Sequence, residues 1–368
     1  MNSTQAYIAL NLLPNIGPVR VQRLLERFDT PEAVLAARAN ELSETKGVGR
    51  DTASLIAGWR EHIDLDAELA KIDKRGLHVL TPADELYPAL LKQIHDPPLV
   101  LYIWGELTPA DAHAIAIVGS RRTTHYGTEA ARKFGFQLAH AGLCVVSGLA
   151  RGIDTAAHEG ALASGGRTVA VIGSGLGQLY PPENMAIAER IAESGAVVSE
   201  FPIDFPPEKR SFPLRNRIVA GWCRGTLVIE APEKSGALIT AGQAAESDRD
   251  VYAVPGPIDR PTSRGANRLI QQGAKLVMDV GDILEDLETF AFTPAPTEIS
   301  APKAKGAATT LTGAEKALYE AMGDEEWHID QLALSANMPL PEVSATLLRL
   351  EMKRLVKQLP GKHFVKLL

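Results

Sequence analysis

Between residues 115 and 288, short continuous apolar runs alternate with longer segments in which apolar residues recur at helical spacing. Short apolar runs bounded by glycine predict strands buried on both faces, as in a parallel sheet. The alternation predicts an α/β fold with an extended, doubly wound, mostly parallel sheet and right-handed crossovers. We expect strands at 115–118, 143–146, 168–172, 196–199, 226–229, 250–254 and 275–277. We expect helices at 127–141, 153–163, 184–194, 215–222, 238–247, 263–271 and 281–288.

The strand at 115–118 runs directly into Gly119, Ser120 and Arg121 and is followed by a helix. Glycine permits a tight turn at this point. Open α/β sheets bind ligands in the crevice at the carboxyl ends of their parallel strands. A hydroxyl and a guanidinium in that crevice suit phosphate. The alternative interpretation is a structural turn with a solvated arginine.

Most of the other predicted strands also run into glycines or polar side chains. Because these strand ends share one edge of a parallel sheet, we expect their cationic side chains to converge on one rim. Helices that open on glycine add N–H groups and a dipole that favour anions there. The cations expected at the rim are Arg121, Arg151, Arg215, Arg217 and Lys234.

Small helices are predicted over residues 1–65, where two segments each give a short helix, a glycine turn and a second helix. They resemble the helix-hairpin-helix (SAM-like) motif, in which backbone N–H groups hold a phosphate. A plain helical hairpin is the other interpretation. Residues 66–112 are expected to form a connector with a helix at 66–75 and strands at 77–80 and 99–104.

The C-terminal part begins after a stretch rich in Pro, Ala and Thr at 289–309, which predicts a linker. Residues 310–368 resemble a winged helix. We expect helices at 312–322, 328–335 and 341–352 and strands at 354–358 and 363–367. The third helix carries its basic residues only at its end. This leaves open whether the domain contacts DNA or protein.

The 368 residues carry a net charge of −7, so any binding of nucleic acid requires a local basic patch. No apolar run is long enough to span a membrane, and no secretory signal is read at the N-terminus. The two cysteines, Cys144 and Cys223, fall in predicted core segments and are interpreted as buried apolar residues. We therefore expect a cytoplasmic protein.

Motifs for catalysis are weak. Val118 is not followed by Gly-x-Gly-x-x-Gly, and no phosphate-binding Walker loop is present. Asp154 and His158 are one helical turn apart, but the favoured interpretation is an aspartate that holds its own loop or caps the helix start, and a histidine that is packed or on the surface. Glu200 and Glu230 follow predicted strands and are interpreted as partners of rim arginines, with general bases of a Rossmann-like phosphoribohydrolase as the alternative. We expect no catalytic residue, metal or cofactor.

Five motifs in order resemble the DprA/Smf family of DNA-processing proteins: Gly-Ser-Arg at 119–121, and the segments 147–154, 199–202, 212–221 and 234–241. The resemblance is strong over about residues 80–288, so a Rossmann-like DNA-binding domain is expected at 66–288. It implies a protein that binds and protects single-stranded DNA, loads the recombinase RecA during natural transformation, and forms homodimers.

The resemblance also implies a phosphate pocket at Gly119, Ser120 and Arg121, surrounded by Arg215, Asn216, Arg217, Lys234 and Ser235. A stacking aromatic such as Phe212 would suit single-stranded DNA. The full set of expected DNA-binding residues is Gly119, Ser120, Arg121, Arg151, Phe212, Arg215, Asn216, Arg217, Lys234, Ser235 and Gly236. A nucleotide-processing enzyme and an adaptor that binds an acidic partner are the two alternatives.

Overall fold

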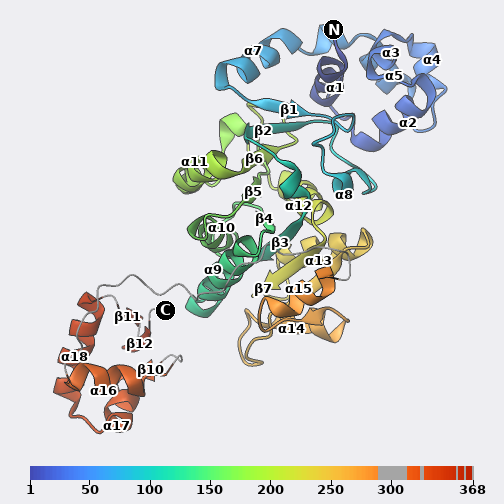
Figure 1. Ribbon diagram of the computed structural model, residues 1–368. Coiled ribbons are helices and arrows are strands. Elements are labelled where there is room, and N and C mark those ends of the chain that lie inside the picture. The colour runs from blue at the N-terminus through green and yellow to red at the C-terminus, as the bar shows by residue number, and fades with distance from the viewer. Residues whose placement is uncertain (289–312, 324–326, 354, 360–361, 367–368) are drawn as a thin grey trace. The chain divides into compact units, whose positions relative to one another are not determined.

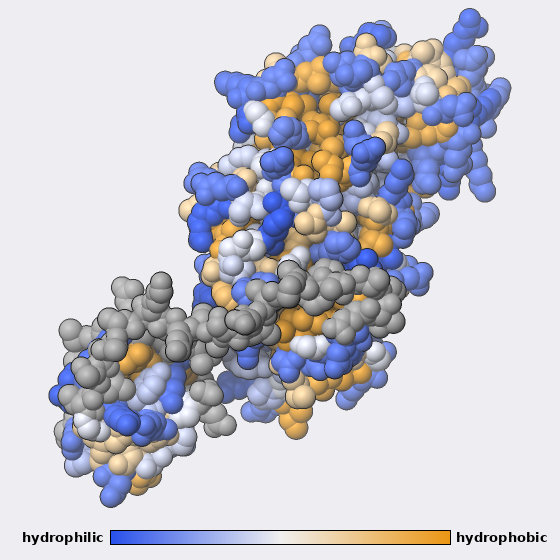
Figure 2. Space-filling view, in the orientation of Figure 1, coloured by the Kyte–Doolittle hydropathy of each residue, from blue (hydrophilic) through white to orange (hydrophobic). Residues whose placement is uncertain are grey.

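The computed structural model describes residues 1–288, 313–323, 327–353, 355–359 and 362–366 (Figure 1). The chain forms two compact units, residues 1–297 and 298–368. In the view of Figure 2, hydrophilic side chains (blue) surround smaller hydrophobic patches (orange) on both units. Within the described residues, no helix is long and apolar enough to cross a membrane.

Seven helices open the first unit: α1 (Ser3–Leu12), α2 (Pro18–Phe28), α3 (Pro31–Ala36), α4 (Ala39–Ser43), α5 (Arg50–Ala57), α6 (Trp59–His62) and α7 (Leu65–Arg75). The two predicted helical hairpins are confirmed, with Gly17 and Gly49 as the N-caps of α2 and α5. Leu10 and Ile56 from these helices share a hydrophobic core with Tyr102 of the sheet. The N-terminal helices are therefore packed against the sheet.

The sheet contains β1 (His78–Leu80), β2 (Leu101–Gly105), β3 (Ala114–Gly119), β4 (Cys144–Ser147), β5 (Thr168–Val171), β6 (Ala196–Ser199), β7 (Gly225–Ile229), β8 (Asp250–Ala253) and β9 (Lys275–Leu276). Its order is β1-β2-β6-β5-β4-β3-β7-β8-β9. The strands from β6 to β9 are parallel, which confirms the predicted sheet. The connector strands β1 and β2 extend its β6 edge in antiparallel pairing, which the sequence did not predict.

Helices cover both faces of the sheet. Alternate residues of β3 point to opposite faces, and because they are apolar on both, each face must pack against helices. Ile115 and Ile117 pack on the side that carries α9 (His125–His140), α10 (Ile153–Ala163) and α15 (Gly281–Glu288). Ala116 and Val118 pack on the opposite side, which carries α8 (Ala89–Lys92), α12 (Ser211–Trp222), α13 (Gly236–Glu246) and α14 (Arg264–Gln271). Helix α11 (Met185–Ser194) lies beside α10 (Figure 1).

From β3 the chain adds β4, β5 and β6 on one side of the sheet and then β7, β8 and β9 on the other, so the strand order reverses at β3. In doubly wound sheets such a reversal opens a crevice at the carboxyl ends of the strands. Gly119 ends β3 there, and a Cβ atom at this position would lie 2.0 Å from the carbonyl oxygen of Ile229. Only glycine therefore lets β3 and β7 approach so closely at the edge where the ligand crevice is expected.

The second unit contains α16 (Gly313–Ala321), β10 (Trp327–His328), α17 (Ile329–Ser335), α18 (Leu340–Met352), β11 (Val356–Leu359) and β12 (His363–Lys366). Its sheet has the order β10-β12-β11, one strand more than predicted. Leu332, Leu347 and Phe364 share its core, and the predicted winged helix is confirmed. The predicted linker 289–309 and the turn at Pro360 and Gly361 lie outside the described residues.

Candidate nucleic-acid interface

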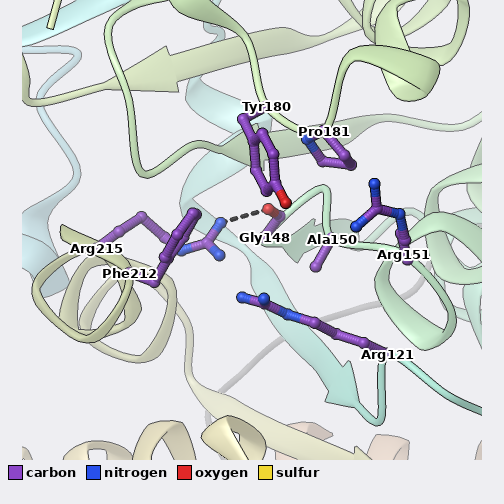
Figure 3. Close-up of a pocket in the computed structure, with 8 residues that line it drawn as sticks. All are labelled: Arg121, Gly148, Ala150, Arg151, Tyr180, Pro181, Phe212 and Arg215. Atoms are coloured by element: carbon purple, nitrogen blue, oxygen red, sulfur yellow. Dashed lines mark hydrogen bonds between the residues drawn. The ribbon is translucent and has the colours of Figure 1, made fainter. Parts of the chain in front are cut away.

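A pocket lies at the carboxyl edge of the sheet, where the loops after β3, β4 and β5 meet the first turns of α12. Figure 3 shows the side chains of three arginines and two aromatic residues around it. Its lining residues are Arg121, Gly148, Ala150, Arg151, Tyr180, Pro181, Phe212 and Arg215. Three of the five cations expected at one rim therefore meet in a single pocket.

Arg215 forms the buried side of the pocket and is only 4% exposed. Its Nη1 donates to the carbonyl oxygens of Gly148 and Val171, at the ends of β4 and β5. Burial lowers the pKa of Arg215 to about 10, partly opposed by the nearby Asp154 carboxylate. The guanidinium is therefore still charged at neutral pH, and it is held rigidly by backbone groups of two strands.

Arg121 and Arg151 are exposed at the pocket, and each lies against an aromatic ring. The guanidinium carbon of Arg121 is 5.1 Å from the ring centre of Phe212, and that of Arg151 is 5.8 Å from Tyr180. Both distances fall within the range of cation–π contacts. Arg151 also forms an ion pair with Glu183. The pocket thus presents guanidinium groups and π faces together, the two features that grip phosphates and bases of single strands.

Tyr180 was not predicted from the sequence. It lies after β5 in a loop without helical or strand periodicity, and only the fold places it 5.8 Å from Phe212, with the two ring planes tilted by 50°. The Tyr-Pro pair at 180–181 is a turn signal in the loop that follows β5. The place of Tyr180 in this loop was the only feature of the sequence that could have indicated its role in the pocket.

Arg217 does not reach this pocket. Its side chain is 9% exposed and pairs with Asp96 and Glu200 on the other side of α12. Two residues along a helix differ by about 200° in direction, so Arg215 and Arg217 cannot face the same site. The prediction that all five cations share one rim site is therefore corrected for Arg217, which serves to hold α12 against the loops around it.

Lys234, Ser235 and Gly236 lie beside the pocket rather than in its lining, at the start of α13. Ser235 caps that helix by accepting from the backbone N–H of Ala237 at 3.2 Å. Asn216 joins α12 to this turn, because its Nδ2 is 3.4 Å from the Gly236 carbonyl oxygen. Lys234 is exposed.

Ser120 supports the turn that carries Arg121 and is itself 6% exposed. Its backbone N–H donates to the Glu230 carbonyl oxygen at 2.8 Å, and its hydroxyl accepts from the backbone N–H of Arg122 at 3.1 Å. Gly119 and Ser120 thus shape the loop, and Arg121 extends from it towards the pocket (Figure 3).

The acidic residues singled out by the sequence have structural partners. Glu200 pairs with Arg217, as interpreted. Among the described residues Glu230 has no arginine partner: its carboxylate accepts from the Thr124 backbone N–H at 2.8 Å and from the hydroxyls of Thr123 and Thr124. The predicted Glu230–Arg pair is therefore wrong, because this carboxylate lies at the start of α9, where backbone and hydroxyl donors surround it.

Asp154 and His158 take the structural roles that were favoured. Asp154 accepts from the backbone N–H groups of Gly148 at 3.2 Å and Ala150 at 3.3 Å, which shapes the loop under the pocket. Burial raises the pKa of Asp154, against the opposing effect of Arg215. His158 is fully buried. No group of three or more metal-ligating side chains is found within the part of the chain that the structure describes.

The N-terminal helices hold the loop that leads from β6 to Phe212. Asn11 Nδ2 donates to the Glu200 carbonyl oxygen at 3.0 Å, and the buried Glu68 accepts from the Ile203 backbone N–H at 2.9 Å. Lys71 pairs with Asp204 at 2.9 Å. The sequence gave no signal for these contacts, which join segments more than a hundred residues apart.

Comparison with known proteins identifies relatives of each part of the chain. Residues 78–288 match the family described as DNA recombination-mediator protein A. Residues 302–362 match the DprA winged helix domain, and residues 8–57 match the SAM-like helix-hairpin-helix tandem.

Two relatives cover most of the chain. Protein Smf of Synechocystis is 36% identical over 99% of both chains. Protein Smf of Escherichia coli is 42% identical over 78% of this chain and 77% of its own.

Two solved structures share the fold. The X-ray structure of DNA processing protein A from Streptococcus pneumoniae superposes with a TM-score of 0.69 at 36% identity, covering 78% of this chain and 99% of that one. DNA processing protein A from Helicobacter pylori, solved for its single-stranded DNA binding mode, gives a TM-score of 0.52 at 29% identity, covering 58% of this chain and 96% of that one.

Proposed function

Because this chain belongs to the DNA recombination-mediator protein A family, also named DprA or Smf, we propose that it binds single-stranded DNA at the pocket of Figure 3. The observation that carries the proposal is the meeting of Arg121, Arg151 and Arg215 with Tyr180 and Phe212 in one pocket. The guanidinium groups hold phosphates, and the rings stack against bases without reading their identity. The binding of single-stranded DNA by the Helicobacter pylori relative supports the same role here.

The other residues predicted to bind DNA have supporting roles in this proposal, apart from Arg217. Gly119 and Ser120 shape the loop that presents Arg121. Lys234, Ser235 and Gly236 at the start of α13, together with Asn216 of α12, contact the strand as it leaves the pocket, because they lie beside the pocket lining. A local cluster of this kind gives strong attraction for a polyanion on a protein whose net charge is −7.

Arg121→Ala is expected to weaken single-stranded DNA binding by about tenfold to a hundredfold, because a charge-assisted bond to phosphate is worth roughly 1.5–3 kcal/mol. The loss should be equal for oligonucleotides of different sequence. The slope of log affinity against log salt should fall by about 0.7 for each lost phosphate contact. Fluorescence anisotropy with labelled oligonucleotides over a salt series measures both quantities.

Arg190→Ala is the matched control, since Arg190 is an exposed arginine on α11 away from the pocket lining. It removes the same charge and should leave affinity almost unchanged. Equal losses in the two variants, or a loss that depends on base sequence, would contradict backbone gripping at the pocket. A duplex of the same length should bind more weakly to the unmodified protein.

We also propose that the bound strand is protected and passed to RecA during natural transformation, a role that the family description as a recombination mediator supports. The test measures assembly of RecA on single-stranded DNA already coated with a single-strand-binding protein. Assembly should become faster when this protein is added, and Arg121→Ala should reduce the effect. No acceleration at saturating protein would contradict the role.

Homodimer formation through the Rossmann-like domain is a further part of the proposal, and it rests on the family resemblance. Light scattering after size-exclusion chromatography should give twice the mass of the 39.5 kDa chain. A mass that stays at one chain over the accessible concentration range would contradict it.

The proposed role is binding without catalysis. Glu200 and Glu230, the carboxylates considered as general bases, are engaged with Arg217 and with Thr123 and Thr124. Release of free base from nucleoside monophosphates would overturn this part of the proposal.

A further inference from the structure

The three pocket arginines differ in how their charge is balanced. Arg215 is buried near Asp154. Arg121 is exposed and lies against the Phe212 ring, and within the described residues it forms no ion pair, although the buried Asp154 lies close enough to interact with its charge. Arg151 is ion-paired with Glu183, and both side chains are about half exposed, at 49% and 48%. Only Arg151 therefore has its charge balanced by a carboxylate at the open side of the pocket.

The pairing of Arg151 with Glu183 is built into the fold. Glu183 lies in a short 3₁₀ turn, Pro182–Asn184, that follows Tyr180. The neighbouring Asn184 is 7% exposed and its Nδ2 donates to the Leu149 carbonyl oxygen at 2.8 Å and to Thr155 Oγ1 at 2.9 Å. Leu149 and Thr155 flank Arg151 in the β4–α10 segment. The turn that carries Glu183 is thus fixed against the segment that carries Arg151.

We propose that Glu183 limits the affinity of the pocket by competing with a DNA phosphate for Arg151, an inference that rests on the proposed function. A carboxylate and a phosphodiester both accept from a guanidinium. Glu183 holds the Nε of Arg151, so a phosphate must either displace the carboxylate from that edge or bind the remaining N–H groups beside its negative charge. An exposed ion pair of this kind is weak, so a phosphate can displace the carboxylate at small cost. The strand first meets the open Arg121, and Arg151 joins when Glu183 moves aside.

Two further observations fit this order of contacts. The pKa of Glu183 is lowered by its bond to Arg151, so the carboxylate is charged at neutral pH. Arg151 also lies over the Tyr180 ring at 5.8 Å, so its guanidinium stays in the pocket when the ion pair opens. Glu183 therefore restrains a cation that is already in place for the strand.

Removing the carboxylate charge should raise affinity. Glu183→Gln keeps the size of the side chain and is expected to tighten single-stranded DNA binding by about twofold to fivefold, the range that an exposed ion pair supports. The salt slope should become steeper by up to about 0.7, because Arg151 then contacts phosphate without first losing a partner. An increase in affinity cannot result from partial unfolding, which makes this variant easy to interpret.

The experiment compares four proteins by anisotropy with a short oligothymidine over a salt series: the unmodified chain, Glu183→Gln, Arg151→Gln, and the double variant. We expect the gain in Glu183→Gln and no gain in the double variant relative to Arg151→Gln. Glu189→Gln, at an exposed position on α11, controls for the general loss of one negative charge. It should change affinity much less than Glu183→Gln.

A gain that persists in the double variant, or that Glu189→Gln reproduces, would show a general charge effect and overturn the inference. The absence of any gain in Glu183→Gln would overturn it as well. In both cases the pocket remains the DNA site if Arg121→Ala still weakens binding. If neither the unmodified chain nor Glu183→Gln binds the oligonucleotide, the proposed function itself fails.

Discussion

Arg215→Met is expected to reduce single-stranded DNA affinity at least tenfold and to lower the free energy of unfolding by about 3 kcal/mol, a cost typical of breaking one side of a buried charge pair. Methionine keeps an unbranched side chain in place of the aliphatic part of arginine but provides neither charge nor donors. The carbonyl oxygens of Gly148 and Val171 then lose their donor, and Asp154 loses the charge that opposes its burial. The pocket would lose a cation together with the bonds that fix the β4 and β5 loops.

Arg217→Met is the matched control for this experiment. Arg217 is also buried on α12, but it pairs with Asp96 and Glu200 outside the pocket. The two variants should be similarly destabilised in urea unfolding, while only Arg215→Met should lose most of its DNA affinity at a temperature where both are folded. Equal affinity losses in the two variants would mean that both substitutions weaken binding by destabilising α12, and that Arg215 does not contact the DNA.

The fold was largely predictable because its strands are buried on both faces. Continuous apolar runs such as 115–118 leave few alternatives, and the seven strands predicted between residues 115 and 277 appear with shifts of at most one residue at either end. The antiparallel addition of β2 to β6 was not predictable in this way. Strand pairing between segments almost a hundred residues apart depends on tertiary packing, which local periodicity does not encode.

The site was predictable to the extent that strand topology determines it. Parallel strands must end at the same edge, so glycine-rich strand ends indicated where Arg121, Arg151 and Arg215 would meet. Side-chain direction was the part that failed. Arg217 turns away because of helical geometry within α12, and Glu230 accepts from threonines because it lies at the start of α9. Tyr180 required the loop conformation itself.

The buried histidine of α10 should make the protein sensitive to acid. His158 is 0% exposed, and burial lowers its pKa to about 3. Thr168 Oγ1 donates to the Val145 carbonyl oxygen at 2.6 Å, so it can only accept from His158 Nδ1, which is 2.7 Å away. The imidazole is therefore neutral with its proton on Nδ1, and Nε2 is buried without a partner within the described residues. A second proton would place an unpaired charge in the core.

The sign of the pH effect follows from the direction of this shift. The pKa in the folded state is below that of an unfolded histidine, about 6.5, so the stabilisation is complete above that pH and is lost as the pH falls towards the folded value of about 3. Between about pH 7.5 and about pH 5 the unfolded state gains a proton that the folded state refuses. This proton alone should cost roughly 2 kcal/mol of unfolding free energy.

His158→Asn tests this expectation, because the Asn Nδ2 can replace the Nδ1 donor to Thr168 while removing the titrating ring. The variant should be less stable at every pH, since the shorter side chain leaves a cavity. Its unfolding free energy, measured in urea at about pH 7.5 and about pH 5, should nevertheless fall by roughly 2 kcal/mol less than that of the unmodified chain. His95→Asn, at an exposed position, should retain the full pH dependence. The same pH dependence in His158→Asn as in the unmodified chain would show that the acid sensitivity arises elsewhere.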